Sequence, residues 1–134
     1  MTAKVQISEL GNCGDARGLR FSAPPEALAF VGRMSDLHLA STKPGAVRGN
    51  HYHLFRREAL VVMPGAKWSL HWGEGQNSPA QHREFNGASA VLVLISPGAS
   101  HAVRNDSDGE DELWLIAISS EPYDPSDTVT HKVT

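Results

Sequence analysis

The sequence contains a single cysteine, Cys13, among its 134 residues. One cysteine excludes an internal disulfide framework and is typical of proteins from a reducing compartment. Because nothing beside Cys13 supplies a base or a metal-ligand pattern, we interpret it as an incidental thiol. Long apolar runs are also absent, since the longest, residues 88–95, has the size of a β-strand rather than of a membrane span.

The chain has no basic block either. Its formal net charge is −3 with an isoelectric point near 6.1, and Arg56 and Arg57 form only a pair. Neither nucleic acid nor an anionic membrane is therefore expected as a partner. Residues 1–10 lack the charged and apolar regions of a signal peptide. Together with the lone cysteine, this predicts a cytoplasmic protein.

No long amphipathic helix is predicted, and the twelve glycines and eight prolines are spread along the whole chain. The length of the chain suits one domain, residues 1–134, with N-terminal strands and turns in 1–33, a barrel core in 34–119 and a trailing C-terminal tail in 120–134. About ten short strands indicate an all-β fold of the jelly-roll type. Alternating or apolar segments predict them at residues 5–7, 19–21, 33–41, 47–54, 58–63, 67–72, 81–85, 90–95, 101–104 and 113–119.

Four potential metal ligands stand out in this pattern. His51 and His53 are two residues apart on one predicted strand, so both side chains point to the same face. Glu58 follows across a short turn, where an antiparallel neighbour would return it to the same ion, and His101 would come from a different hairpin. Three imidazoles and one carboxylate suit zinc, iron, manganese, nickel or cobalt, and the lack of thiolate argues against a closed structural zinc site.

The remaining histidines are interpreted differently. His71, His82 and His131 lie in polar contexts and are predicted to be solvated, whereas His38 is open between a pocket residue and an unremarkable one. Trp68 and Trp72 share one face of a predicted strand. We expect that face to be barrel core rather than an interface between subunits.

The candidate ligands stand in a spacing that resembles the first cupin motif. Gly45, five residues, His51, one residue, His53, four residues, Glu58, six residues and Gly65 match every fixed position of that motif. This resemblance implies a cupin barrel, which is a double-stranded β-helix of the jelly-roll class.

A second segment resembles the end of the second cupin motif. Gly98, two residues, His101, three residues and Asn105 match it. The proline departs from the motif, because Pro97 is adjacent to the glycine and Ser96 occupies the expected proline position. The resemblance still implies a metal role for His101.

A narrower resemblance is to the sugar-nucleotide cupins. The stretch KPGAVRGNHYH, residues 43–53, and GDARG, residues 14–18, look like segments of the dTDP-4-keto-6-deoxyhexose 3,5-epimerases. Residues 42–45, 48–53 and 121–133 resemble the C-terminal cupin domain of the bifunctional capsular polysaccharide reductase. In that domain two histidines, a glutamate and a later histidine hold zinc, and a keto-sugar nucleotide is epimerised. The resemblance thus implies a role in polysaccharide biosynthesis.

By that resemblance the zinc ligands here are His51, His53, Glu58 and His101. In the 3,5-epimerases the histidine that resembles His51 acts as a base without metal. His53 occupies a position that is usually glutamine in that group, and this difference favours metal binding.

The first functional hypothesis is a metal-dependent epimerase or isomerase of a keto-sugar nucleotide. It removes a proton next to a ketone, stabilises the resulting enediolate through the metal as a Lewis acid and returns the proton. Tyr52, His38 and Tyr123 are the candidate acids and bases. Arg48 is a candidate for binding a phosphate or the enolate oxygen. Strict alternation places Arg48 on the face opposite the metal, so its role requires a bulge at Gly49.

Two alternatives stay open. A cupin oxygenase would use the same four ligands for iron or manganese, and a non-catalytic module would use the barrel to hold a small ligand. The metal is expected to be zinc, with iron, manganese and nickel as alternatives. Edge strands of a small jelly roll need cover, which predicts a homodimer, and a monomer by light scattering would contradict it.

Overall fold

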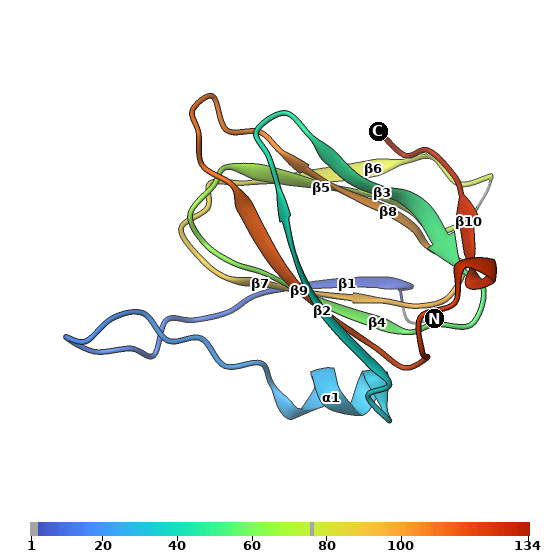
Figure 1. Cartoon of the computed structure of the whole chain (residues 1–134), viewed down its shortest axis with the longest axis horizontal. Coiled ribbons are helices and arrows are strands. Elements are labelled where there is room, and N and C mark those ends of the chain that lie inside the picture. Colours follow the sequence, from blue (N-terminus) through green and yellow to red (C-terminus); the bar gives the residue numbers. More distant parts are fainter. Residues whose placement is uncertain (1–2, 76) are drawn as a thin grey trace.

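In this computed structural model, which describes residues 3–75 and 77–134, ten strands form two five-stranded antiparallel sheets. The strands of the first sheet lie in the order β1 (Val5–Glu9), β7 (Val91–Ile95), β4 (Glu58–Val62), β9 (Leu113–Ser119) and β2 (Asp36–Thr42). Those of the second lie in the order β10 (Thr128–Thr130), β3 (Val47–His53), β8 (Ser100–Asn105), β5 (Trp68–Gly73) and β6 (Gln81–Phe85). Figure 1 shows the sheets facing each other. The predicted all-β, double-stranded β-helix fold is confirmed.

The main core lies between the sheets. Trp68 and Leu70 of β5 are fully buried there, and the ring of Trp68 stacks on Phe85 with centroids 4.3 Å apart. Trp72 continues the same face and packs partly buried against the core. The expectation that this tryptophan face belongs to the core is therefore confirmed.

A second, smaller core lies on the outer side of the first sheet. Helix α1 (Pro25–Val31) covers this side in Figure 1, and its Val31 belongs to the same buried cluster as Leu92 and Leu94 of β7. Strand β7 is buried on both faces, which explains its uninterrupted apolar sequence. Pro25 begins the helix, and Gly32, at a φ of 74°, ends it.

Two local predictions are wrong. Residues 19–21 form no strand, and the preceding segment contains only an isolated bridge between Asp15 and Gly18, in a loop that extends away from the sheets in Figure 1. His71, predicted to be solvated, is buried at 8% exposure, where it pairs with the Ser69 hydroxyl and stacks on His82.

The C-terminal segment was expected to trail off the last strand, and this expectation is wrong. Its 3₁₀ turn η1 (Pro125–Asp127) leads into β10, which pairs with β3 so that Thr128 lies opposite His53. His131, predicted to be solvated, is half-buried and shares a hydrogen bond with the hydroxyl of Ser100. The tail thus completes the edge of the sheet that carries the histidine motif.

Within the described residues, no helix has both the length and the apolar character needed to cross a membrane. The edge strand β2 exposes Leu37 and Leu39. Pairing between subunits through such an edge is what the expected homodimer requires, and the dimer stays a prediction.

Candidate metal centre

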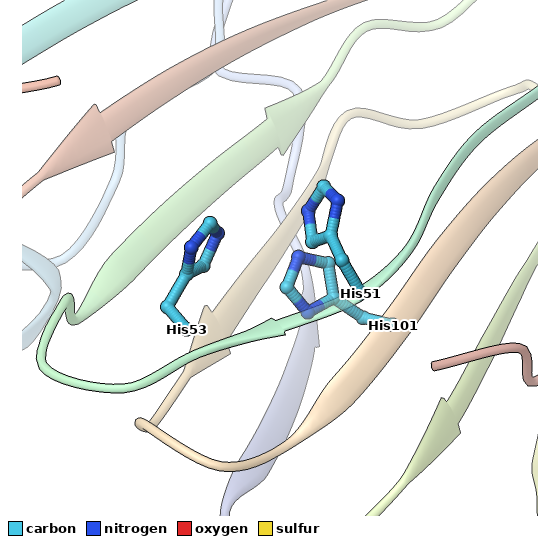
Figure 2. A group of neighbouring side chains, drawn as sticks. All are labelled: His51, His53 and His101. Carbon is cyan, nitrogen blue, oxygen red and sulfur yellow. The ribbon is translucent and has the colours of Figure 1, made fainter. Parts of the chain in front are cut away.

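Three histidines of the second sheet converge on one point. His51 and His53 project from β3, and His101 projects from β8, directly opposite His51 in the strand register. One ring nitrogen from each lies within 4.8 Å of the others. Figure 2 shows the three imidazoles gathered together. Alternation along β3 and pairing with β8 therefore create a group that could hold a metal ion.

A bulge sets the spacing of this group. The register between β3 and β8 shifts between Gly49 and His51, and the intervening Asn50 has a φ of 59°. Gly49 has a φ of 115°, and a Cβ there would lie 2.5 Å from the carbonyl oxygen of His101. Only glycine allows β3 to approach the strand of His101 this closely.

Replacing Gly49 with alanine should therefore damage both fold and site. We expect the free energy of unfolding to fall by about 3 kcal/mol, because the cost of the strained backbone and the cost of the steric overlap with His101 add together. Gly45→Ala is the matched control, since Gly45 also has a positive φ but open space around it, and it should cost about 1 kcal/mol. Urea unfolding measures both, and equal losses would contradict the close-approach explanation.

The turn before β8 is tied to the same strand. Gly98, at a φ of 85°, donates its backbone N–H to the carbonyl oxygen of His53 at 2.8 Å. The buried amide of Asn105 donates to the carbonyl oxygens of Thr42 and Asp111. The matching residues of the second motif thus anchor both ends of the strand that carries His101.

Glu58 reaches the histidines from the first sheet. Its Oε1 lies 3.4 Å from Nε2 of His101, and its Oε2 lies 3.9 Å from Nε2 of His53. The two strands involved are not neighbours, because β3 and β4 belong to different sheets. The expected antiparallel return is therefore wrong, although the four candidate ligands do come together.

The protonation states suit metal ligation. Burial disfavours the charged carboxylate of Glu58, but the hydrogen bond with His101 and the charges of His101, His53 and Arg56 prevail and lower its pKa to about 2. Burial, followed by the charges of His101 and His53, lowers the pKa of His51 to about 4. Burial also lowers the pKa of His53. At neutral pH Glu58 is therefore a carboxylate and His51 and His53 are neutral imidazoles, the forms that bind divalent cations.

The hydrogen bonds of the rings also fit a cation. Nδ1 of His101 lies 3.0 Å from the carbonyl oxygen of Ala99, which can only accept a proton, so Nε2 is left to face Glu58. Nε2 of His53 is buried without a hydrogen-bond partner among the described residues. A buried unpaired nitrogen beside two imidazoles and a carboxylate is a donor set that a divalent cation would satisfy.

The cluster lines a cavity of about 690 Å³ whose lining residues come from both sheets. Apolar residues that include Leu60, Val103 and Leu115 form part of its wall, and polar and charged side chains form the other part. This volume is in the range that holds small organic ligands. The site therefore combines a candidate cation-binding group with room for a substrate.

Three of the four predicted acid, base or anion-binding residues line this cavity. They are His38, whose Nδ1 lies 3.3 Å from Oδ2 of Asp36, Arg48, whose Nε donates to the carbonyl oxygen of Ser41, and the exposed Tyr123. The bulge required for Arg48 is present. Tyr52 is not among the lining residues, and its ring faces His131 at a centroid distance of 6.1 Å.

Arg56 was missed from the sequence because an arginine pair resembles a solvated charge. It is only 5% exposed and lines the cavity beside Glu58, with Nη1 3.9 Å from Oε2 of that residue and 4.0 Å from Oδ2 of Asp36. Nη2 donates to the carbonyl oxygen of Pro122. Its place two residues before a motif glutamate is the only sequence signal for this role.

Comparisons with known proteins indicate the family and the fold of the chain. The family described as polysaccharide biosynthesis C-terminal domain matches residues 26–131. No curated protein matches the chain. The fold resembles the sugar 3,4-ketoisomerase QdtA from Thermoanaerobacterium thermosaccharolyticum, with a TM-score of 0.74 at 17% identity over 98% of this chain and 90% of that one.

Two further solved structures are similar. The 3'-monoepimerase ChmJ from Streptomyces bikiniensis has a TM-score of 0.76 at 19% identity, covering 95% of this chain and 69% of that one. The capsular polysaccharide assembling protein CapF from Staphylococcus aureus has a TM-score of 0.65 at 25% identity, covering 75% of this chain and 27% of that one. The chain thus corresponds to about a quarter of CapF.

Two facing sheets with a histidine cluster in the cavity between them define a cupin-type double-stranded β-helix protein. Within that class, the chain belongs to the polysaccharide biosynthesis C-terminal domain family. The resemblance to the sugar-nucleotide cupins, inferred from two motifs, is confirmed.

Proposed function

We propose that this protein is a metal-dependent isomerase or epimerase that acts on a keto-sugar nucleotide. The observation that carries the proposal is a three-histidine, one-carboxylate cluster that lines a cavity together with acid–base and cationic side chains. Relatives of the same fold support the substrate class, since a mutant of QdtA was solved with TDP-4-keto-6-deoxyglucose and ChmJ with dTDP-quinovose. The family description supports a role in polysaccharide biosynthesis.

The proposed cofactor is zinc, held by His51, His53, His101 and Glu58. When bound, the cation would draw charge from the ketone oxygen and so acidify the neighbouring C–H bond. The imidazoles and the carboxylate are already gathered, and the lowered pKa values of His51, His53 and Glu58 leave these three groups in their metal-binding forms, so little reorganisation accompanies binding.

Proton transfer is assigned to residues on other walls of the cavity. His38 on β2 lies on the opposite sheet from the histidine cluster, and Asp36 orients its ring through Nδ1, which leaves Nε2 to accept a proton from carbon. Tyr123 presents a phenol from the C-terminal segment and can return a proton to the other face of the sugar. Nε of Arg48 donates to the carbonyl oxygen of Ser41, and the terminal N–H groups of its guanidinium can bind the diphosphate of the nucleotide sugar.

Exchange with solvent deuterium tests this proposal. Metal-loaded protein incubated in D₂O with TDP-4-keto-6-deoxyglucose should place deuterium on a carbon that flanks the ketone, detected by NMR. His38→Asn should keep its metal content but slow exchange by roughly 100-fold or more, because a positioned base is lost. Absence of exchange across a panel of nucleotide-linked keto-sugars, with metal bound, would contradict the function itself.

A further inference from the structure

Asp127 is a buried carboxylate that the C-terminal segment places beside the cluster. It is 5% exposed, and its Oδ1 accepts the backbone N–H of Phe55 at 2.8 Å. Its own carbonyl oxygen accepts the N–H of Leu54 at 2.9 Å. Its Oδ2 is buried, has no hydrogen-bond partner among the residues that the structure describes, and lies 3.8 Å from Nδ1 of His53. The carboxylate is therefore fixed by one oxygen and turned toward the histidine with the other.

The surroundings of His53 are asymmetric. Its Nδ1 faces Oδ2 of Asp127 and also lies 3.3 Å from the hydroxyl of Thr128, whereas its Nε2 points toward Glu58 at 3.9 Å. A carboxylate can only accept a proton, so it favours the tautomer with hydrogen on Nδ1. That tautomer leaves a lone pair on Nε2, the nitrogen that faces the cluster.

We propose that Asp127 is a positioning residue that holds His53 in the tautomer able to bind a metal, so that the C-terminal segment forms part of the metal site. The inference rests on the metal binding in the proposed function. The pairing of β10 with β3, with Thr128 opposite His53, fixes the segment in the required register. A buried oxygen without a partner, such as Oδ2 of Asp127, lowers the stability of the fold if it has no polar group nearby. An N–H on Nδ1 of His53 would compensate this cost electrostatically.

The direct test is the tautomer of His53 in the metal-free protein, measured by NMR correlations between ring nitrogens and ring protons. The unmodified chain should show hydrogen on Nδ1. In Asp127→Asn, Oδ1 can still accept from Phe55, but an amide nitrogen replaces the oxygen that faces His53. Because an amide N–H only donates, hydrogen should move to Nε2, and the affinity for zinc should fall by roughly 10- to 100-fold.

Asp124→Asn is the matched control. Asp124 is an exposed carboxylate of the same segment that caps η1 through Ser126, a role that asparagine also fills. It should change neither the tautomer nor the affinity for zinc. Hydrogen on Nε2 in the unmodified protein, or unchanged zinc affinity in Asp127→Asn, would overturn the inference. Neither readout involves a sugar nucleotide, so failure here is distinct from failure of the proposed reaction.

Discussion

His101→Ala is expected to abolish stoichiometric zinc binding and to reduce the proposed isomerisation to background. His101 supplies the ring from β8 that joins the two rings from β3, and its Nε2 is the nitrogen nearest to Glu58. Losing a group that merely orients a ligand already costs roughly 10- to 100-fold in affinity, so losing a ligand should cost more. Metal analysis of purified protein and competition titration with a zinc chelator measure the effect.

His82→Ala is the control for this substitution. His82 is an exposed histidine of β6 that stacks on His71 rather than on the cluster, so its removal should leave the zinc content unchanged. Full metal content in both His51→Ala and His101→Ala would show that the proposed assignment of the metal ligands is wrong. Iron instead of zinc in the unmodified protein, together with oxygen consumption, would favour the oxygenase alternative.

The sequence predicted those parts of the site that depend on local geometry. Alternation placed His51 and His53 on one face, because side chains of a strand point alternately to its two sides. Glu58 and His101 were also candidates, but only the cupin spacing tied them to the same site, since no local rule says which strands meet across a barrel. The assumed antiparallel return of Glu58 was wrong for the same reason, because a four-residue turn can cross between sheets as easily as it can close a hairpin.

Buried polar residues account for most of what the sequence did not reveal. Arg56, Asp127 and His71 belong to residue types that are usually exposed, and each is buried because a specific distant or lateral partner compensates it. Asp127 lies in a polar tail whose composition is typical of a mobile end. Its burial depends on β10 pairing with β3, more than seventy residues away, which local patterns do not encode.

Arg56→Met is expected to destabilise the metal-free protein by about 3 kcal/mol. Methionine preserves much of the side-chain volume but removes the cation next to Glu58, which is left as a buried carboxylate with less compensation. The substitution also removes the hydrogen bond to the carbonyl oxygen of Pro122, which holds the segment that carries Tyr123. Urea unfolding after chelation measures the loss. Arg83→Met, at an exposed pair with Glu9, should cost less than about 1 kcal/mol.

Zinc should compensate for the missing guanidinium. A divalent cation held by Glu58 and the three histidines supplies positive charge at the same carboxylate, so added zinc should raise the melting temperature of Arg56→Met more than that of the unmodified protein. Arg83→Met should respond to zinc as the unmodified protein does, because its charge lies outside the cavity. Equal zinc-induced shifts in all three proteins would mean that Arg56 and the cation do not share Glu58, and that the arginine serves only to hold the C-terminal segment.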